Sequence, residues 1–209
     1  MALFCYNTPM DSLRRLEEIF SHFPGIGPRQ AKRFVHYIQG KSPTAVKELT
    51  DLIQEVKKNT GECNQCHRFF TNGSKTCTIC SNPERDQTTL MIVARDSDFE
   101  TIEKSAVYKG LYFVLGGTVP VLDKEPDKKI RLKSLLERVN KDGESLKEII
   151  ISTNTTPDGD HTRDILKDAI KKIALPQTKI SVLGRGLSTG AELEYADSET
   201  IRNALGNRK

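Results

Sequence analysis

Four cysteines form two close pairs in the sequence, Cys63-x2-Cys66 and Cys77-x2-Cys80, separated by ten residues. Each CxxC turn can supply two sulfur ligands, and four thiolates satisfy the tetrahedral preference of Zn²⁺. A closed shell of four thiolates leaves no position for a catalytic water. We therefore expect one structural zinc ion per chain, held by the four cysteines rather than by His67, which adjoins Cys66 and is the alternative ligand.

The alternative chemistry for these pairs is redox, but a thioredoxin-like site needs one CxxC beside a β-α-β unit rather than two pairs. A disulfide framework is not expected, because the N-terminus shows no secretion signal and cytoplasmic thiols stay reduced. The fifth cysteine, Cys5, stands alone and is expected to be an ordinary thiol.

A second candidate site is the segment PGIGP at residues 24–28, between two stretches with helical periodicity. Gly25 and Gly27 can adopt a positive φ and carry no side chain, so their backbone N–H groups can approach a phosphate closely. The helix that begins at Pro28 adds the positive end of its dipole. The segment resembles the helix-hairpin-helix DNA-binding motif, with a plain turn between two helices as the alternative.

Three cations directly follow this turn. Arg29 and Arg33 are four residues apart and so share one face of the helix, with Lys32 beside them. We expect the two arginines to make most of the contact with DNA phosphates and Lys32 to be secondary. Contacts of this kind read no base sequence.

The distribution of charge favours an anionic partner. The net charge is +4, and residues 1–82 hold 11 Lys or Arg against 7 Asp or Glu, whereas residues 83–209 hold 21 of each. No acidic residue lies between Glu18 and Glu48. Such a stretch attracts a polyanion, although a solvated helix face can have the same composition.

Periodic patterns show which elements must position these residues. Helical spacing of apolar residues predicts N-terminal helices at 13–23, from Pro28 and from Ser42, and the cysteine segment 63–80 has loop composition. From Leu90, short apolar runs alternate with helical stretches, which predicts β-α-β units around a mainly parallel sheet. Strands are expected at 90–94, 111–115, 148–152 and 180–183, and helices at about 98–106, 131–140, 162–174 and 197–205.

The order of these parts and several motifs resemble the RecR family, from about Leu13 to Leu205. The matching stretches, besides the CxxC pairs, are LRRLEEIFSHFPGIGPRQAKR at 13–33, YKGLYFVLGGTVPVLD at 108–123, IIISTNTTPDGDHT at 149–162 and LGRGLSTGAELEYAD at 183–197. The resemblance implies an α+β fold of several modules. These are a helix-hairpin-helix region at 1–56, a four-cysteine zinc finger at 57–84, a Toprim domain with a mainly parallel sheet at 85–180, and an oligomerisation segment with a short helix at 181–209.

The resemblance also implies what the protein does. It implies a homotetrameric ring able to surround duplex DNA, and partnership with RecO and RecF in loading RecA onto gaps covered by single-strand-binding protein. We expect a cytoplasmic, nucleoid-associated protein without a membrane partner, since no apolar run approaches the ~20 residues needed to cross a bilayer.

Catalytic Toprim domains hold Mg²⁺ with a Glu after the first strand and an Asp-x-Asp after a later one. The aligned positions here are Ala94, Asn154 and Thr156, so we expect no catalysis. Four aspartates lie nearby but are offset from these positions: Asp96, Asp98, Asp158 and Asp160.

RecR proteins usually keep an acidic residue where Ala94 stands, and the family contacts RecO through this face. Ala94 followed by Arg95 is therefore a departure from the family, and we expect Asp158 and Asp160 to be the acidic residues that remain on that face.

Three functions compete for this sequence. A non-catalytic, DNA-binding recombination mediator explains the hairpin, the cysteines and the missing carboxylates together. A Mg²⁺-dependent topoisomerase or nuclease explains only the Toprim fold, and a zinc-ribbon adaptor that binds protein alone leaves the charged hairpin unexplained. The mediator is the hypothesis that the sequence favours.

Overall fold

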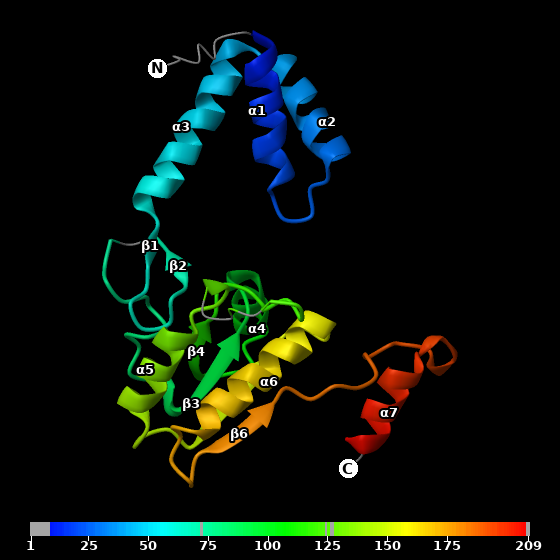
Figure 1. The fold of residues 1–209 in the computed structure, drawn as a ribbon. Helices are drawn as coiled ribbons and strands as arrows, with labels where there is room; N and C mark the ends of the chain where they lie inside the picture. The colour runs from blue at the N-terminus through cyan, green and yellow to red at the C-terminus, as the bar shows by residue number, and fades with distance from the viewer. Residues whose placement is uncertain (1–8, 72, 124, 126–127, 208–209) are drawn as a thin grey trace. The chain divides into compact units, whose positions relative to one another are not determined.

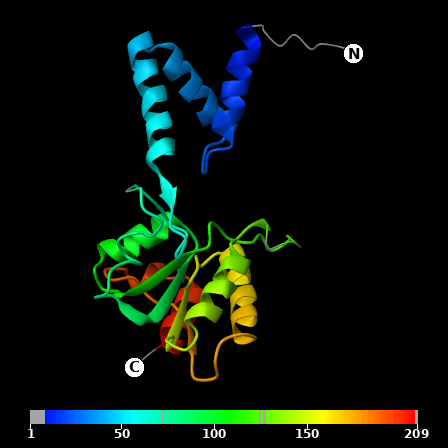
Figure 2. The same ribbon diagram turned by 90° about the vertical axis from the view of Figure 1, so that its left-hand side faces the viewer.

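The structure, a computed structural model of the 209-residue chain, describes residues 9–71, 73–123, 125 and 128–207 (Figures 1 and 2). Cys5 lies outside the described residues. The chain divides into two compact units, Met1–Asn59 and Thr60–Lys209. Each unit has its own packing and is described by itself.

The first unit is helical. Its helices are α1 (Pro9–Ser21), α2 (Pro28–Gln39) and α3 (Pro43–Asn59). Ala31 and Val35 of α2 are buried, and the ring of Phe20 on α1 lies 5.7 Å from that of Phe34. These contacts join α1 and α2 into a hairpin.

Helix α3 leaves most of its apolar residues exposed to solvent. None of its described residues is buried, and Ile53 and Val56 are 60% and 63% exposed. Its start is fixed locally: the Ser42 hydroxyl accepts a hydrogen bond from the Ala45 N–H at 3.3 Å, which caps one of the free donors at the helix N-terminus.

The second unit is built on a parallel sheet with the strand order β4-β3-β5-β6. Its strands are β3 (Asp86–Val93), β4 (Gly110–Val114), β5 (Glu148–Ser152) and β6 (Lys179–Val182). The connecting helices are α4 (Asp96–Lys104), α5 (Leu132–Asp142) and α6 (Pro157–Lys171). The alternation predicted from residue 90 onward is therefore confirmed.

The two faces of this sheet are both buried, which explains why its strands read as continuous apolar runs. On one face, Ile92 and Phe113 pack with residues of α5 and α6 such as Leu135 and Leu166. On the other face, strand residues pack against Phe99 of α4. The sheet is thus the middle layer of three.

The structure corrects the predicted start of α6. The sequence pattern placed this helix at about 162–174, but it runs from Pro157 to Lys171. The Thr156 hydroxyl accepts a hydrogen bond from the Gly159 N–H at 3.2 Å, and Pro157 takes the first helical position, where a missing N–H costs nothing.

Two shorter differences concern strands. Strand β3 begins at Asp86, four residues before the predicted start at Leu90. The cysteine segment also contains a two-stranded antiparallel pair, β1 (Gly61–Glu62) with β2 (Phe69–Phe70), where only loop was expected. The pair holds the two ends of the first CxxC turn together.

The chain ends in a 3₁₀ turn (Leu193–Tyr195) and helix α7 (Ser198–Gly206). The Asp197 carboxylate caps α7 by accepting from the N–H groups of Glu199 and Thr200, both at 2.9 Å. No residue of α7 is buried. Among all described helices, none combines the length and the apolar character needed to span a membrane.

Candidate metal centre and nucleic-acid interface

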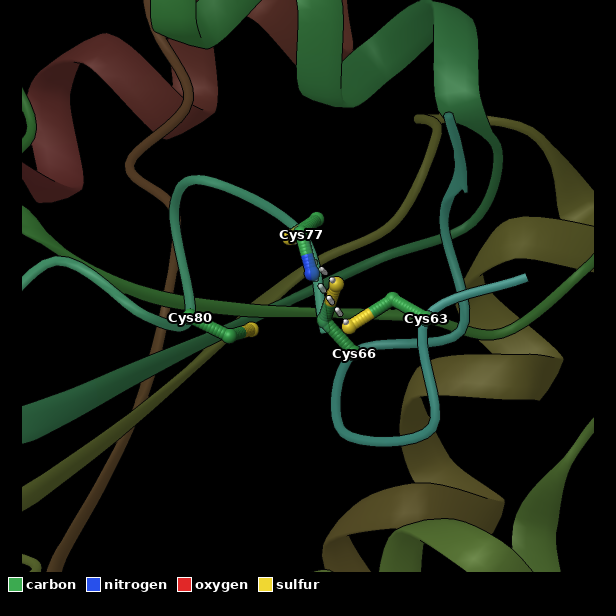
Figure 3. Close-up of side chains that lie close together, drawn as sticks. All are labelled: Cys63, Cys66, Cys77 and Cys80. Atoms are coloured by element: carbon green, nitrogen blue, oxygen red, sulfur yellow. Dashed lines mark hydrogen bonds between the residues drawn. The ribbon is translucent and has the colours of Figure 1, made fainter. Parts of the chain in front are cut away.

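The four predicted cysteines come together at one point of the second unit (Figure 3). Their Sγ atoms all lie within 4.8 Å of one another, and the Sγ atoms of Cys66 and Cys77 are 3.6 Å apart. A tetrahedral Zn²⁺ with sulfur ligands at ~2.3 Å sets its sulfurs about 3.8 Å apart. The cluster is therefore positioned to bind one metal ion.

The backbone shapes each CxxC turn so that its sulfurs face inward. The Cys63 N–H donates to the Arg68 carbonyl at 2.9 Å, and the His67 N–H donates to the Cys63 carbonyl at 2.9 Å. His67 has a φ of 59°, which closes the turn. In the second pair, the Ser81 N–H donates to the Cys77 carbonyl at 3.0 Å.

His67 is not part of the sulfur cluster. Its Nδ1 lies 2.6 Å from Oε1 of Glu62, and its ring packs 5.1 Å from that of Phe113. The metal-binding group in the described chain contains the four cysteines alone. The imidazole instead orients Glu62, which also pairs with Arg131 at 3.2 Å.

The electrostatics of this cluster favour binding of a cation. Cys63, Cys66 and Cys77 are fully buried. The hydrogen bond to Cys77, together with burial, raises the pKa of the Cys66 thiol, because four sulfurs in close contact cannot all ionise unaided. A divalent ion bound here would compensate the negative charge of the thiolates, and the donor set fits a metal that prefers sulfur ligands.

The segment that carries the two CxxC turns, called the metal module below, is attached to the edge of the sheet by hydrogen bonds. The Val114 N–H at the end of β4 donates to the Cys66 carbonyl at 2.8 Å, and the Phe69 N–H donates to Oδ1 of Asp96 at 3.0 Å. Ile79 packs against both the cysteine cluster and the α4 face of the sheet. Loss of the metal is thus expected to reach the core of the second unit.

The hairpin turn between α1 and α2 presents free backbone donors. Gly25 has a φ of +75°, which favours glycine, whereas Gly27 has a φ of −88° and is the N-cap of α2. Only Gly25 therefore uses the conformational freedom that the sequence suggested for both glycines. The first intrahelical bond is from Ala31 N–H to the Gly27 carbonyl at 3.0 Å, so the N–H groups of Arg29 and Gln30 remain available.

The three predicted cations lie in the first two turns of α2, beside these donors. Arg29, Lys32 and Arg33 are all exposed. In the described ranges no carboxylate lies within ion-pair distance of any of them. By contrast, arginines of the second unit such as Arg85 and Arg185 are paired with carboxylates. The hairpin cations are therefore available to an external anion.

At the carboxyl end of β3, the residues at and directly after Ala94 have structural roles. Ala94 is fully buried. Asp98 accepts a hydrogen bond from the Arg95 N–H at 2.9 Å and so caps α4, while Asp96 holds Phe69 of the metal module. Neither aspartate joins a cluster of metal-ligating side chains in the part of the chain that the structure describes.

The first turn of α6 carries Asp158 and Asp160, and both carboxylates already have partners. Oδ1 of Asp158 accepts from the Val121 N–H at 3.0 Å. Asp160 pairs with Arg163 at 2.8 Å and with Arg185, and the hydrogen bond from Arg185 lowers the pKa of the Asp160 carboxyl. The two aspartates lie close in the chain but bind different segments.

Two residues that sequence reasoning missed complete this turn. The Thr162 hydroxyl accepts from the Val119 N–H at 2.8 Å and donates to the Asp158 carbonyl at 2.6 Å. Arg185 reaches Asp160 from the segment after β6, and its carbonyl accepts from the Asn207 side chain at 2.6 Å. The stretches 108–123, 149–162 and 183–197 therefore meet here.

Comparison with known proteins agrees with these features. Residues 88–184 match the Toprim domain family, and residues 186–209 match the family described as RecR, C-terminal. A protein named Recombination protein RecR from Lactococcus lactis subsp. cremoris is 37% identical over 198 residues, covering 95% of this chain and 96% of the relative.

Two further relatives with the same name lie at similar distance. The Bacteroides thetaiotaomicron protein is 35% identical over 90% of this chain and 89% of its own length, and the Rippkaea orientalis protein is 35% identical over 94% and 96%. The similarity spans the helical hairpin, the cysteine pairs and the parallel sheet. This chain is a member of the RecR family of recombination proteins.

Proposed function

We propose that this protein is a non-catalytic DNA-binding mediator of recombinational repair. The observation that carries the proposal is the hairpin turn: free backbone N–H groups and three cations without ion pairs stand together at residues 25–33. Phosphate oxygens bind such an arrangement whatever the bases are. The names of the relatives support a role in recombination.

The proposal is tested by titrating the protein against fluorescent duplexes of unrelated sequence. The Kd should be the same within about twofold for all of them, since phosphate contacts carry no sequence information. The Kd should also rise steeply with salt, because each phosphate contact releases counterions. A Kd that is insensitive to salt would contradict a phosphate clamp.

The metal at the cysteine cluster is proposed to be Zn²⁺, held by Cys63, Cys66, Cys77 and Cys80. Four thiolates in a closed tetrahedral arrangement are the donor set of structural zinc. The ion would supply positive charge and rigidity to the module, with no position open for substrate.

We further propose that the α6 end of the Toprim domain is the surface for a RecO-type partner, with RecF-type proteins in the same pathway. Asp158 and Asp160 are the acidic residues there, both half-buried. Because Asp160 is paired with Arg185, a basic partner has to compete with that arginine for the carboxylate. Binding of the partner at Asp160 would therefore release Arg185 and alter the contact that this residue makes with the C-terminal segment.

The protein is expected to show no strand cleavage, relaxation or priming with Mg²⁺ or Mn²⁺. Ala94 cannot ligate a metal, and the neighbouring Asp96 and Asp98 are used as structural acceptors. Supercoiled plasmid incubated with protein and metal should remain unchanged on a gel. Relaxation that disappears in an Asp158→Asn or Asp160→Asn variant would overturn this expectation.

We propose that the working form is an oligomer, a tetrameric ring in which several hairpins act on one DNA. One hairpin is a weak ligand, and linked sites raise apparent affinity strongly. The described α7 and α3 both expose apolar residues, among them Leu205 at 57% and Val56 at 63%. Exposed apolar faces on helices of this length call for a packing partner.

A chain that lacks residues 197–209 should therefore fall to dimers or monomers and lose affinity for DNA, although its hairpin is intact. Multi-angle light scattering gives the mass of the full-length and shortened chains, and anisotropy gives their Kd for DNA. A monomeric full-length protein at micromolar concentration with DNA present would refute the ring.

A further inference from the structure

A pocket beside the hairpin turn has a composition that phosphate binding does not explain. Its volume is about 630 Å³, and it is lined by Gly25, Ile26, Gln30, Arg33, Phe34 and Tyr37. The turn between α1 and α2, visible in Figure 1, forms one side, and one face of α2 forms the other. The pocket thus adjoins the cations of the proposed clamp.

Two aromatic rings of the pocket are open to solvent. Phe34 is 42% exposed and Tyr37 is 62% exposed. Phe34 is not loose, because its ring also contacts that of Phe20 at 5.7 Å. A positioned and exposed aromatic surface next to a turn points to a ligand with a flat face.

The charges around the pocket favour an anionic ligand. Arg33 lines the pocket and has no acidic partner in the described chain, and Nζ of Lys41 lies 4.2 Å from the centre of the Tyr37 ring. No Asp or Glu occurs between Glu18 and Glu48. The ligand should therefore combine aromatic faces with negative charge, as a nucleotide does.

We propose that this pocket takes an unstacked nucleobase of single-stranded DNA, which stacks on Phe34 and Tyr37 while the turn binds the adjacent phosphates. The proposal rests on the hairpin being the DNA-binding element, and it adds a preference for single-stranded over duplex DNA. Bases in a duplex are paired and stacked inside the helix, so only a single strand or a gap can fill the pocket. Every base has an aromatic face, which keeps the binding independent of sequence.

The chain offers a direct spectroscopic test because it contains no Trp. In a Tyr37→Trp variant, the single indole should be quenched by a base-containing single strand of about 20 nucleotides. An oligonucleotide of the same length made of abasic sites should leave the emission unchanged at a concentration at which anisotropy shows binding. A Leu122→Trp variant, with its side chain in the second unit at a position that is 92% exposed, is the control and should not be quenched by either strand.

Measured affinities for single-stranded and duplex DNA distinguish base stacking in the pocket from phosphate binding by the turn and its cations (the clamp). Tyr37→Ala should lower the ratio of single-strand to duplex affinity about tenfold, the effect of losing one base–aromatic stack, and Tyr37→Phe should restore it. Arg29→Glu/Arg33→Glu should lose affinity for both single-stranded and duplex DNA. If the double variant loses affinity for both kinds of DNA but Tyr37→Ala leaves the affinity ratio unchanged, phosphate binding by the turn is supported and base stacking in the pocket is contradicted.

Two other results would also contradict the proposed binding of a base in the pocket. One is equal quenching of Tyr37→Trp by the abasic strand, which would place phosphates rather than bases near the ring. The other is a fall in solution mass of Tyr37→Ala with an unchanged affinity ratio, which would make the pocket a contact between copies of the chain.

Discussion

Reversing the two hairpin arginines, Arg29→Glu/Arg33→Glu, should weaken DNA binding at least about 100-fold for every sequence tested. Each lost charge-assisted contact to phosphate is worth about 1.5 kcal/mol or more, and two of them correspond to about two powers of ten in Kd. The introduced carboxylates add repulsion. Arg29 and Arg33 are exposed and form no ion pair in the described chain, so the fold should be retained.

The salt dependence of the same variant gives a second readout. The slope of log Kd against log salt should shrink by about 2 for duplex DNA, since two phosphate contacts are gone. The control is Lys171→Glu/Lys172→Glu in the second unit, which has the same formal net charge and alters two exposed lysines. If the control weakens binding as much as the hairpin variant, net charge rather than the turn governs affinity.

Removing the metal should destabilise the whole second unit, not the cysteine module alone. Structural metal binding is coupled to folding, and a loss of about 4 kcal/mol corresponds to a fall in Tm of about 10 °C for a unit of this size. The loss should spread because the Cys66 carbonyl accepts from Val114 of β4 and Ile79 packs in two apolar clusters.

Calorimetry of Cys66→Ala, together with elemental analysis, measures this coupling. The variant should lose its metal and melt earlier, whereas Cys5→Ala should keep one metal ion per chain and the wild-type Tm. A Cys66→Ala protein without metal that melts like the wild type would show that the ion does not support the fold.

Local sequence patterns were sufficient to predict the cysteine cluster and the hairpin turn. The spacing of Cys63, Cys66, Cys77 and Cys80 identifies the donor set because each CxxC turn is a short-range structure. The same holds for Gly25, whose positive φ belongs to a turn closed by the Ile26 N–H bond to the Phe23 carbonyl at 3.0 Å. Neither needs distant parts of the chain.

The roles of the aspartates could not be read from the sequence, because their partners are distant in it. Asp158 binds the backbone of Val121, and Asp160 binds Arg185, 25 residues away. The start of α6 was misplaced for a related reason. Pro157, Asp158 and Gly159 look like a turn, although a Thr cap, a proline at the first position and acidic side chains in the first turn are all features of a helix start.

Gly159 shows how tightly this region is packed. A Cβ on Gly159 would lie 2.0 Å from the Asn154 carbonyl oxygen, so a side chain cannot be accommodated without moving the backbone. The glycine is required by close approach within the helix start, not by loop flexibility. Such a requirement appears only when the loop after β5 and α6 are seen together.

The central claim, that the protein mediates recombination by binding DNA through its hairpin, is tested most directly on a gapped plasmid covered by fluorescent single-strand-binding protein. With RecA and a RecO-type partner present, wild-type protein should accelerate displacement of the fluorescent protein from the gap, and Arg29→Glu/Arg33→Glu should not. If the folded double variant accelerates displacement as well as the wild type does, the hairpin is not the element through which this protein works.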